Sequence, residues 1–329
     1  MTLTTENNAK KIGILIEFEN GKIKKAEYGV ITAAREAGHE LYALVTETEE
    51  IDCRESLQIY GIEKIVMLSS KPEHLKQNPV RQAKAIIMAM NHFGIHTLCG
   101  LTSPWGKDLL PRIAAALDAP LVIDCLHVNF ADNIAQKPQY SGKTVADIKV
   151  RGTYYIFGIR PNVTEAVEAP CRAEIIHFET NVDSKRFKVK DVKPGASRGV
   201  NLSEADIIIS GGRAMRNTEN YKILYDCAEV LNAAVGASRV AVDAGWVPHA
   251  MQVGQTGATV NPKLYIACGI SGSVQHFAGM KTAGIIVAVN TDPDANMMRN
   301  CDYGITGDLF EIVPIFTRQL KEVPELNQL

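Results

Sequence analysis

The chain has 329 residues, of which 46% are hydrophobic and 22% are charged, and its formal net charge is -2. This length exceeds what one hydrophobic core usually covers, so we expect two domains. The nearly balanced charge and the lack of a long basic run argue against nucleic-acid binding, which depends on neutralising phosphates. The apolar runs are shorter than the roughly 18 residues that span a bilayer, so we expect no membrane insertion.

Seven cysteines are scattered along the chain without a Cys-x-x-Cys pair. An odd, dispersed set in a chain of this size is typical of reduced thiols, and we expect neither a disulfide framework nor a metal site. The polar residues 1–11 lack the apolar core of a signal peptide. Together these features predict a cytoplasmic protein.

The first half alternates short β-branched runs with helical patterns, which is typical of a largely parallel sheet covered by helices. One helical pattern covers residues 109–117, with Asp108 as its N-cap and Pro111 in its first turn. The strands that we expect in this half are 12–18, 41–45, 64–68, 97–101 and 120–124.

Between residues 143 and 180 the runs follow one another without helices, which predicts an antiparallel extension with strands 144–151, 154–159 and 173–178. A charged stretch with Pro and Gly follows at 183–195. Its lysines suit either a solvated linker or an interaction patch, and we take it as a linker. The predicted domains are therefore residues 1–198 and 199–329.

The second domain restarts the alternation of strands and helices. We expect helices at 221–231 and 308–320, and strands at 207–210, 240–242, 264–268 and 285–289. The sequence thus predicts an α/β protein with two doubly wound domains, each built on a mostly parallel sheet.

Two turns of the second domain have the composition of phosphate-binding loops. The turn from Ile270 to Ser273 links an apolar strand to a helix, where free N–H groups and the helix dipole suit an anion. Gly-Gly-Arg at 211–213 combines glycines, which permit close approach, with an Arg that pairs bidentately with phosphate. Close packing explains each turn equally well when it is considered alone.

Other polar residues of this domain also have ordinary structural explanations. His276 fits a hydrogen-bonded core histidine, Arg239 a salt-bridge partner, and Thr256 a turn hydroxyl between two glycines. All of them nevertheless lie where strands end and helices begin, which is where open α/β sheets bind ligands. The region therefore predicts a crevice for an anionic ligand of cofactor size.

Taken in order, these motifs resemble the α subunits of electron transfer flavoproteins. The first domain contributes residues 106–114 and 119–124 to the resemblance. The second contributes Gly-Gly-Arg (211–213), Gly-Ala-Ser-Arg (236–239), Val-Asp-Ala-Gly (242–245), Met-Gln-Val-Gly-Gln-Thr-Gly (251–257), and the stretches 264–280, 290–293 and 302–310.

The resemblance implies that the second domain has flavodoxin-like or DHS-like topology and binds FAD. By resemblance, the pyrophosphate and ribityl region would be held by Arg213, Ser238, Ser271 and the turn at Gly272. The adenosine part would contact Asn290, Asp308 and Leu309.

The isoalloxazine ring would be lined by Val253, Gly254, Gln255 and Thr256, with Thr256 reaching N5 and Gln255 the O4 edge. Gln275 and His276 would approach the ring from its O2 side, and Arg239 would lie over it. Ser273 and Val274 would also belong to the cofactor-binding residues. One-electron reduction places negative charge on N1–C2=O, so a cation or donor there is stabilising. We therefore expect Arg239 and His276 to raise the first reduction potential, and we expect no nucleophile or general base.

The resemblance also implies a heterodimer, in which a β subunit binds AMP or a second FAD. The first domain, which lacks Gly-x-Gly-x-x-Gly after its first strand, would serve as scaffold and β-subunit contact. A conventional carrier moves electrons from acyl-CoA dehydrogenases to a quinone oxidoreductase, whereas a bifurcating one divides electrons from NADH between ferredoxin and a second acceptor. The sequence leaves this choice open. It also leaves open a non-redox regulatory protein that binds adenine nucleotides, and an NAD-dependent hydrolase or deacetylase.

Overall fold

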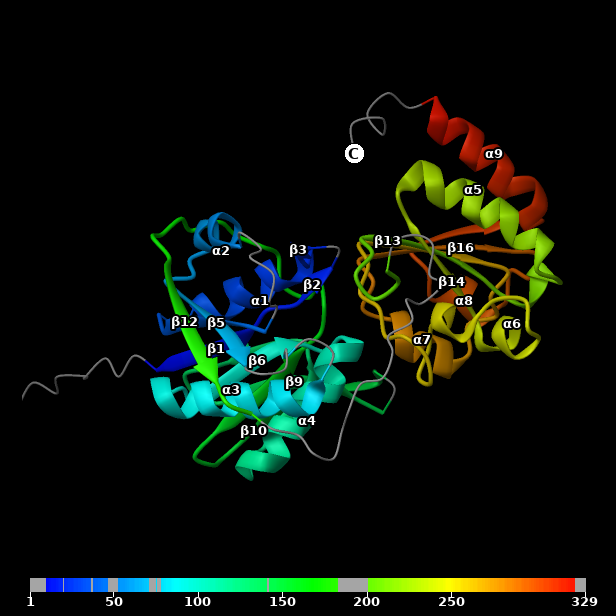
Figure 1. Ribbon diagram of the computed structural model, residues 1–329. Helices are drawn as coiled ribbons and strands as arrows, with labels where there is room; N and C mark the ends of the chain where they lie inside the picture. The colour runs from blue at the N-terminus through cyan, green and yellow to red at the C-terminus, as the bar shows by residue number, and fades with distance from the viewer. Residues whose placement is uncertain are drawn as a thin grey trace, which may run out of the picture. The chain divides into compact units, whose positions relative to one another are not determined.

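The structure is a computed structural model in which two compact units are described separately (Figure 1). The described residues are 10–19, 21–36, 38–46, 53–70, 75, 78–140, 142–182 and 201–322. Unit 1 contains those up to 138 and from 145 to 182, and unit 2 contains the others. The predicted linker and the boundary at 198/199 lie outside the described residues, so that boundary stays a prediction.

Unit 1 is built on a seven-stranded sheet with the order β12-β5-β4-β1-β6-β11-β7, in which every neighbouring pair is parallel. Its central strands are continuous apolar runs, as expected for a sheet that is covered on both faces. The strands are β1 (Lys11–Leu15), β4 (Glu40–Val45), β5 (Lys64–Ser70), β6 (Thr97–Leu101), β7 (Leu121–Cys125), β11 (Tyr155–Ile159) and β12 (Glu174–Thr180).

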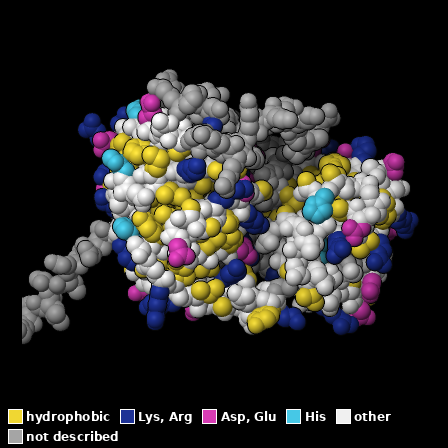
Figure 2. All heavy atoms as spheres, turned by 60° about the horizontal axis from the view of Figure 1, so that its bottom comes forward, with side chains coloured by type: hydrophobic (Ala, Val, Ile, Leu, Met, Phe, Trp, Pro, Cys, Tyr) yellow, Lys and Arg dark blue, Asp and Glu magenta, His cyan; other side chains and the backbone are white. Residues whose placement is uncertain are grey.

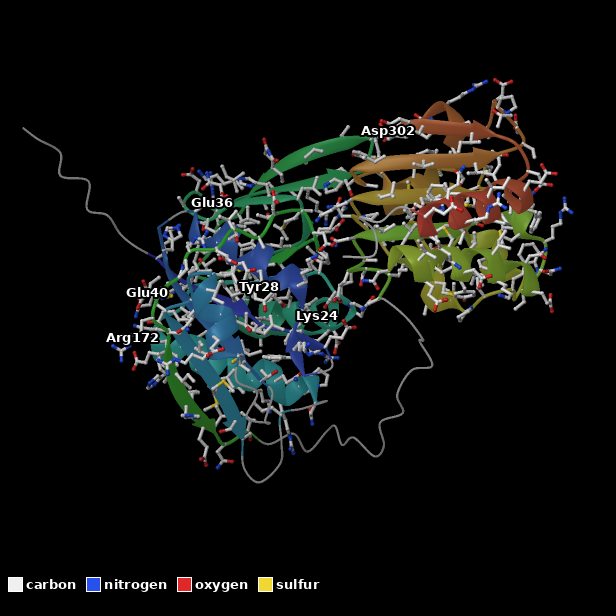
Figure 3. The ribbon with its side chains drawn as sticks, turned by 90° about the horizontal axis from the view of Figure 1, so that it is seen from above. Lys24, Tyr28, Glu36, Glu40, Arg172 and Asp302 are labelled. Carbon is white, nitrogen blue, oxygen red and sulfur yellow. The ribbon has the colours of Figure 1, made fainter. Side chains whose placement is uncertain are left out.

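Helices cover both faces of this sheet, so unit 1 is doubly wound as predicted. One hydrophobic core lies under α1 (Lys25–Arg35) and α2 (Arg54–Ile59), and the other lies under α3 (Pro79–Phe93) and α4 (Pro104–Leu117). Figure 3 labels Lys24 and Glu36, which lie at the two ends of α1. Two small sheets complete the unit: β2 (Phe18–Glu19) with β3 (Lys22–Ile23), and β8 (His127–Asn129) with β9 (Ile134–Gln139) and β10 (Thr144–Lys149).

The predicted antiparallel extension is wrong for two of its three strands. β11 lies between β6 and β7, and β12 pairs with β5, all in parallel. The run Tyr-Ile-Phe-Gly-Ile of β11 is almost wholly buried, which suits an interior parallel strand better than a half-exposed hairpin strand. Of the three, β10 alone belongs to the separate small sheet.

The helix predicted at 109–117 begins earlier, at Pro104. Ser103 is its N-cap, because Ser103 Oγ accepts a hydrogen bond of 2.9 Å from the Gly106 amide. Asp108, the predicted cap, lies inside the helix and pairs with Arg112. A Ser cap followed by Pro at the first helical position is the stronger start signal.

Unit 2 is built on five parallel strands with the order β14-β13-β15-β16-β17. The chain runs from β13 outward to β14 and then returns across β13 to β15. The carboxyl edge between β13 and β15 is therefore the topological switch point, where open sheets of this kind bind ligands. The strands are β13 (Ile207–Gly211), β14 (Ala234–Ala237), β15 (Leu264–Cys268), β16 (Ile285–Asn290) and β17 (Tyr303–Thr306).

Helices on both faces make unit 2 doubly wound as well (Figure 1). One core lies under α5 (Lys222–Leu231) and α9 (Leu309–Lys321), and the other lies under α7 (Val274–Met280) and α8 (Asn296–Arg299). The remaining helical segments are α6 (Arg239–Asp243) and the 3₁₀ turns η1 (Arg213–Met215), η2 (Glu219–Tyr221) and η3 (His249–Met251). Throughout the described ranges, the helices are too short or too polar to cross a membrane.

One predicted strand of unit 2 is wrong. Residues 240–242 belong to α6, and the strand that pairs with β13 is β14, whose Ala-Val-Gly-Ala sequence has weak β-propensity. Pairing with a buried neighbour outweighs such local preferences.

Candidate functional site

The loops at the carboxyl edge of the unit 2 sheet converge on one place. β13, β14 and β15 are parallel, so the residues that follow them emerge on the same side. Gly212 donates a hydrogen bond of 2.9 Å to the Cys268 carbonyl, and a Cβ on Gly212 would lie 2.0 Å from the Gly269 oxygen. The two loops at the switch point thus touch backbone to backbone, a contact that requires glycine.

A cavity of about 670 Å³ opens at this edge. Its volume lies within the range of about 300–1,000 Å³ that is common for cofactor and small-molecule sites. Most of the residues predicted from the sequence line it: Arg213, Ser238, Arg239, Val253, Gly254, Gln255, Thr256, Ser271, Ser273, Gln275, His276 and Asn290.

The other four predicted residues lie around this cavity. Asp308 and Leu309 line a neighbouring cavity of about 70 Å³, which shares Asn290 with the large one. Gly272 has a φ of +78°, and a Cβ there would lie 2.4 Å from the Met297 amide nitrogen, so its role is to shape the turn. Val274 begins α7, is 47% exposed and does not line either cavity.

Two buried polar atoms in the cavity wall lack a hydrogen-bond partner among the described residues. They are Ser238 Oγ and His276 Nδ1. Buried polar atoms are nearly always paired in folded proteins, and exceptions point to a missing ligand, ion or water. The cavity therefore fits a ligand that offers hydrogen-bonding groups to both atoms.

His276 is held in the wall as a neutral ring. Its Nε2 lies 3.0 Å from the Tyr265 hydroxyl, and the side chain is 5% exposed. Burial lowers the pKa of His276 to about 4, and the nearby backbone of Val253 opposes this only in part. The sequence leaves open whether His276 acts as a cation or as a hydrogen-bond donor. At neutral pH the imidazole is uncharged, so it can serve only as a neutral donor or acceptor.

Arg239 carries a positive charge at the cavity and is held there by a weak surface ion pair. It lines the cavity, but its side chain is 68% exposed and its Nε lies 3.2 Å from Asp243 in an i,i+4 pair. Such surface pairs contribute about 0.3–0.5 kcal/mol, so Arg239 can exchange Asp243 for an anionic or aromatic ligand at little cost.

The loop that contains Thr256 is fixed by a residue that sequence reasoning missed. Gln252 is 3% exposed, lines the cavity, and donates from Nε2 to Thr256 Oγ1 at 2.9 Å. The Gln255 amide donates to the Gln275 carbonyl at 2.8 Å, which ties the loop to α7. The signal for Gln252 was a polar residue between two apolar ones in a Gly-rich motif.

Arg216 is a second missed residue. It lines both cavities, and its guanidinium lies 5.6 Å from the centre of the Phe310 ring. Its φ of +69° is unusual for Arg, and strain of about 1–3 kcal/mol of this kind tends to occur at functional sites. Its place three residues after Arg213 in the same loop was the available signal.

The chemistry of the site is that of cofactor binding. In the described part of the chain, no group of three or more His, Cys, Asp or Glu side chains could hold a metal ion. A switch-point cavity with glycine turns, three arginines in its lining and unpaired buried donors or acceptors defines a binding protein for a phosphate-bearing cofactor, built on two α/β units.

Comparisons with known proteins identify the family. The family described as "Electron transfer flavoprotein domain" matches residues 12–183, and the "Electron transfer flavoprotein FAD-binding domain" matches residues 201–281. The chain belongs to the electron transfer flavoprotein α subunits, and unit 2 is its FAD-binding domain.

Named relatives are similar over nearly the full length. The electron transfer flavoprotein subunit alpha of Bacillus subtilis (strain 168) is 36% identical, covering 95% of this chain and 98% of that protein. The one from Thermoanaerobacterium thermosaccharolyticum is 35% identical, covering 96% and 99%. The probable mitochondrial one from Caenorhabditis elegans is 35% identical, covering 95% and 96%.

Proposed function

We propose that this chain is the FAD-bearing half of a cytoplasmic heterodimer that carries electrons between an acyl-CoA dehydrogenase-type partner and a further acceptor. The observation that carries the proposal is the unit 2 cavity, with Ser238 Oγ and His276 Nδ1 buried and unpaired among the described residues. When bound, FAD supplies the redox chemistry, and the chain supplies binding and electrostatic tuning.

The roles proposed for the residues follow from their places in the wall. Arg213 and Ser238, after β13 and β14, would hold the pyrophosphate together with Ser271 after β15. Asn290, which lines both cavities, would lie on the adenosine side with Asp308 and Leu309 of the smaller cavity.

On the ring side, Thr256 would present a hydroxyl that Gln252 already orients, with Gln255 beside it. His276 would offer a neutral hydrogen bond, and Arg239 would supply the positive charge near the ring. Charge that develops on a bound cofactor is stabilised by such fixed dipoles and cations.

The proposed partner is a β subunit that binds AMP or a second FAD. Apolar side chains gather on the face of unit 1 that Figure 2 shows, which is typical of a protein-contact surface.

Coexpression with the β subunit and counting of bound cofactors tests the proposal. One FAD plus one AMP per heterodimer supports a conventional carrier that feeds a quinone oxidoreductase. Two FAD, with reduction by NADH, support electron bifurcation to ferredoxin and a second acceptor. A colourless protein that binds only AMP would contradict both and support a non-redox, adenine-nucleotide-binding regulator.

A further inference from the structure

The buried hydroxyl of Tyr265 contacts the His276 ring on its core side. Tyr265, in β15, is fully buried, and its hydroxyl lies 3.0 Å from His276 Nε2. The two rings meet nearly edge to face with centroids 6.0 Å apart. Because this contact lies inside the core, one hydrogen atom must be shared between the phenol and the imidazole.

Both groups are uncharged at neutral pH. Burial lowers the pKa of His276 to about 4 and raises the pKa of Tyr265 well above its ordinary value. The neutral imidazole then has one N–H, which lies either on Nε2 or on Nδ1. If Tyr265 donates to Nε2, the hydrogen must be on Nδ1.

Donation by Tyr265 is favoured, because a phenol O–H is a stronger donor than a neutral imidazole N–H and an imidazole nitrogen is a stronger acceptor than a phenol oxygen. Ser210 Oγ is buried without a hydrogen-bond partner among the described residues, and its side chain lowers the pKa of Tyr265. The backbone of Val253 raises the pKa of His276, but among the described residues no hydrogen bond of good geometry joins it to Nδ1. Donation by Tyr265 to Nε2 therefore leaves the Nδ1 hydrogen for a partner in the cavity.

We propose that Tyr265 is a positioning residue that fixes His276 as the Nδ1–H tautomer, so that the imidazole offers a donor to an oxygen acceptor in the cavity. The role of this tautomer toward FAD rests on the proposed function. A carbonyl oxygen of the cofactor is attracted by an N–H and repelled by the lone pair of the other tautomer. His276 lines the cavity, and Nδ1 is the ring nitrogen that the core leaves unpaired.

The tautomer can be read by ¹⁵N NMR of the histidine ring in the heterodimer, with and without flavin. The signals are assigned by their loss in His276→Asn. We expect the Nδ1–H form in the natural protein. Tyr265→Phe should lower the ratio of Nδ1–H to Nε2–H by about 2- to 12-fold, which corresponds to one neutral hydrogen bond. An Nε2–H form in the natural protein overturns the proposal, even if Tyr265→Phe fails to fold.

Tyr221→Phe is the matched control. Tyr221 is equally buried in unit 2, and its hydroxyl donates to the Gly211 carbonyl at 3.1 Å instead of contacting a histidine. This variant should leave the ratio unchanged, whereas an unchanged ratio in folded Tyr265→Phe overturns the proposal.

A double-mutant test adds a cofactor readout. An Asn at position 276 carries its own amide donor, so its donor does not depend on the phenol. Tyr265→Phe should lower the first reduction potential in the natural background and not in His276→Asn, and an equal shift in both backgrounds overturns the proposal. A heterodimer without flavin would contradict the proposed function alone, because the tautomer is also read without flavin.

Discussion

The two sheets of this protein present their carboxyl edges in opposite ways. In unit 1, side chains at the switch point between β1 and β6 contact one another: Glu17 accepts from Ser103 Oγ at 2.5 Å and pairs with Lys24 at 3.0 Å, and the Glu17 backbone amide donates to Glu27 Oε1 at 3.0 Å. In unit 2, the corresponding place holds the large cavity and two buried atoms without partners among the described residues.

The difference shows that a switch point is a place for a ligand only when its own side chains leave it open. Glu17 and Glu27 are both buried and would repel a phosphate, whereas unit 2 presents Arg213 and glycine turns. The same architecture thus serves as a filled core edge in one unit and as a cofactor site in the other.

The largest expected effect comes from closing the open switch point. In Gly212→Val, the new side chain must displace the backbone at Gly269, because even a Cβ would lie 2.0 Å from that carbonyl oxygen. We expect FAD affinity to fall by about 5- to 150-fold, since overpacking of this kind costs about 1–3 kcal/mol. The loss of FAD is measured by the flavin absorbance of the purified heterodimer. Gly245→Ala has nothing within 4 Å of the added Cβ but a φ of +74°, so it should cost some stability and keep its flavin.

The pH dependence of stability tests the neutral, buried state of His276. Its folded-state pKa is about 4 and its ordinary value is 6.5, so the unfolded chain binds the proton more readily. Stability is therefore highest above pH 6.5 and falls by up to about 3 kcal/mol as the pH is lowered to 4. Urea unfolding of the flavin-free chain measures this slope. His276→Asn should flatten it, and replacement of the exposed His249 by Asn should leave it unchanged.

Two serines distinguish the filled edge from the open one. Ser103→Ala removes the cap of α4 and a bond to Glu17, so it should destabilise the chain by about 2 kcal/mol without loss of flavin. Ser238→Ala removes no hydrogen bond from the described part of the chain and should weaken FAD binding about tenfold with little change in stability. Urea unfolding and flavin dissociation are measured for both variants. If the two variants lose stability and FAD affinity to the same extent, the proposed difference between the two sheet edges is wrong.

The smallest effect is expected at Arg239. Because its pair with Asp243 lies at the surface, Arg239→Lys should change stability by less than about 0.5 kcal/mol. It should lower the first reduction potential by the equivalent of about 1 kcal/mol, since Lys lacks the planar stacking group. An unchanged first reduction potential would show that Arg239 does not tune the flavin.

The sequence predicts the doubly wound class because its apolar runs are spaced by helical patterns. The strand ends indicate only a ligand crevice, and the individual cavity residues come from the resemblance to the family. The sequence could not separate parallel from antiparallel pairing for β11 and β12, since their partners are distant in sequence. The helix start at Ser103 was missed although its Ser-Pro signal was present.

Parts of the site depend on tertiary contacts that no local pattern contains. The neutrality of His276 arises from its burial against Tyr265, and the orientation of Thr256 comes from Gln252. Arg216 was overlooked because its positive φ and its contact with Phe310 become visible only in the fold.

The central claim is that FAD occupies the open edge of unit 2 and leaves the filled edge of unit 1 unchanged. Hydrogen exchange of the heterodimer with and without FAD tests it most directly. FAD should slow exchange at residues 212–216, 238–239, 252–256 and 269–276, with no change at 16–18 and 102–106. Slowed exchange at the unit 1 edge, with none at the unit 2 loops, would contradict it.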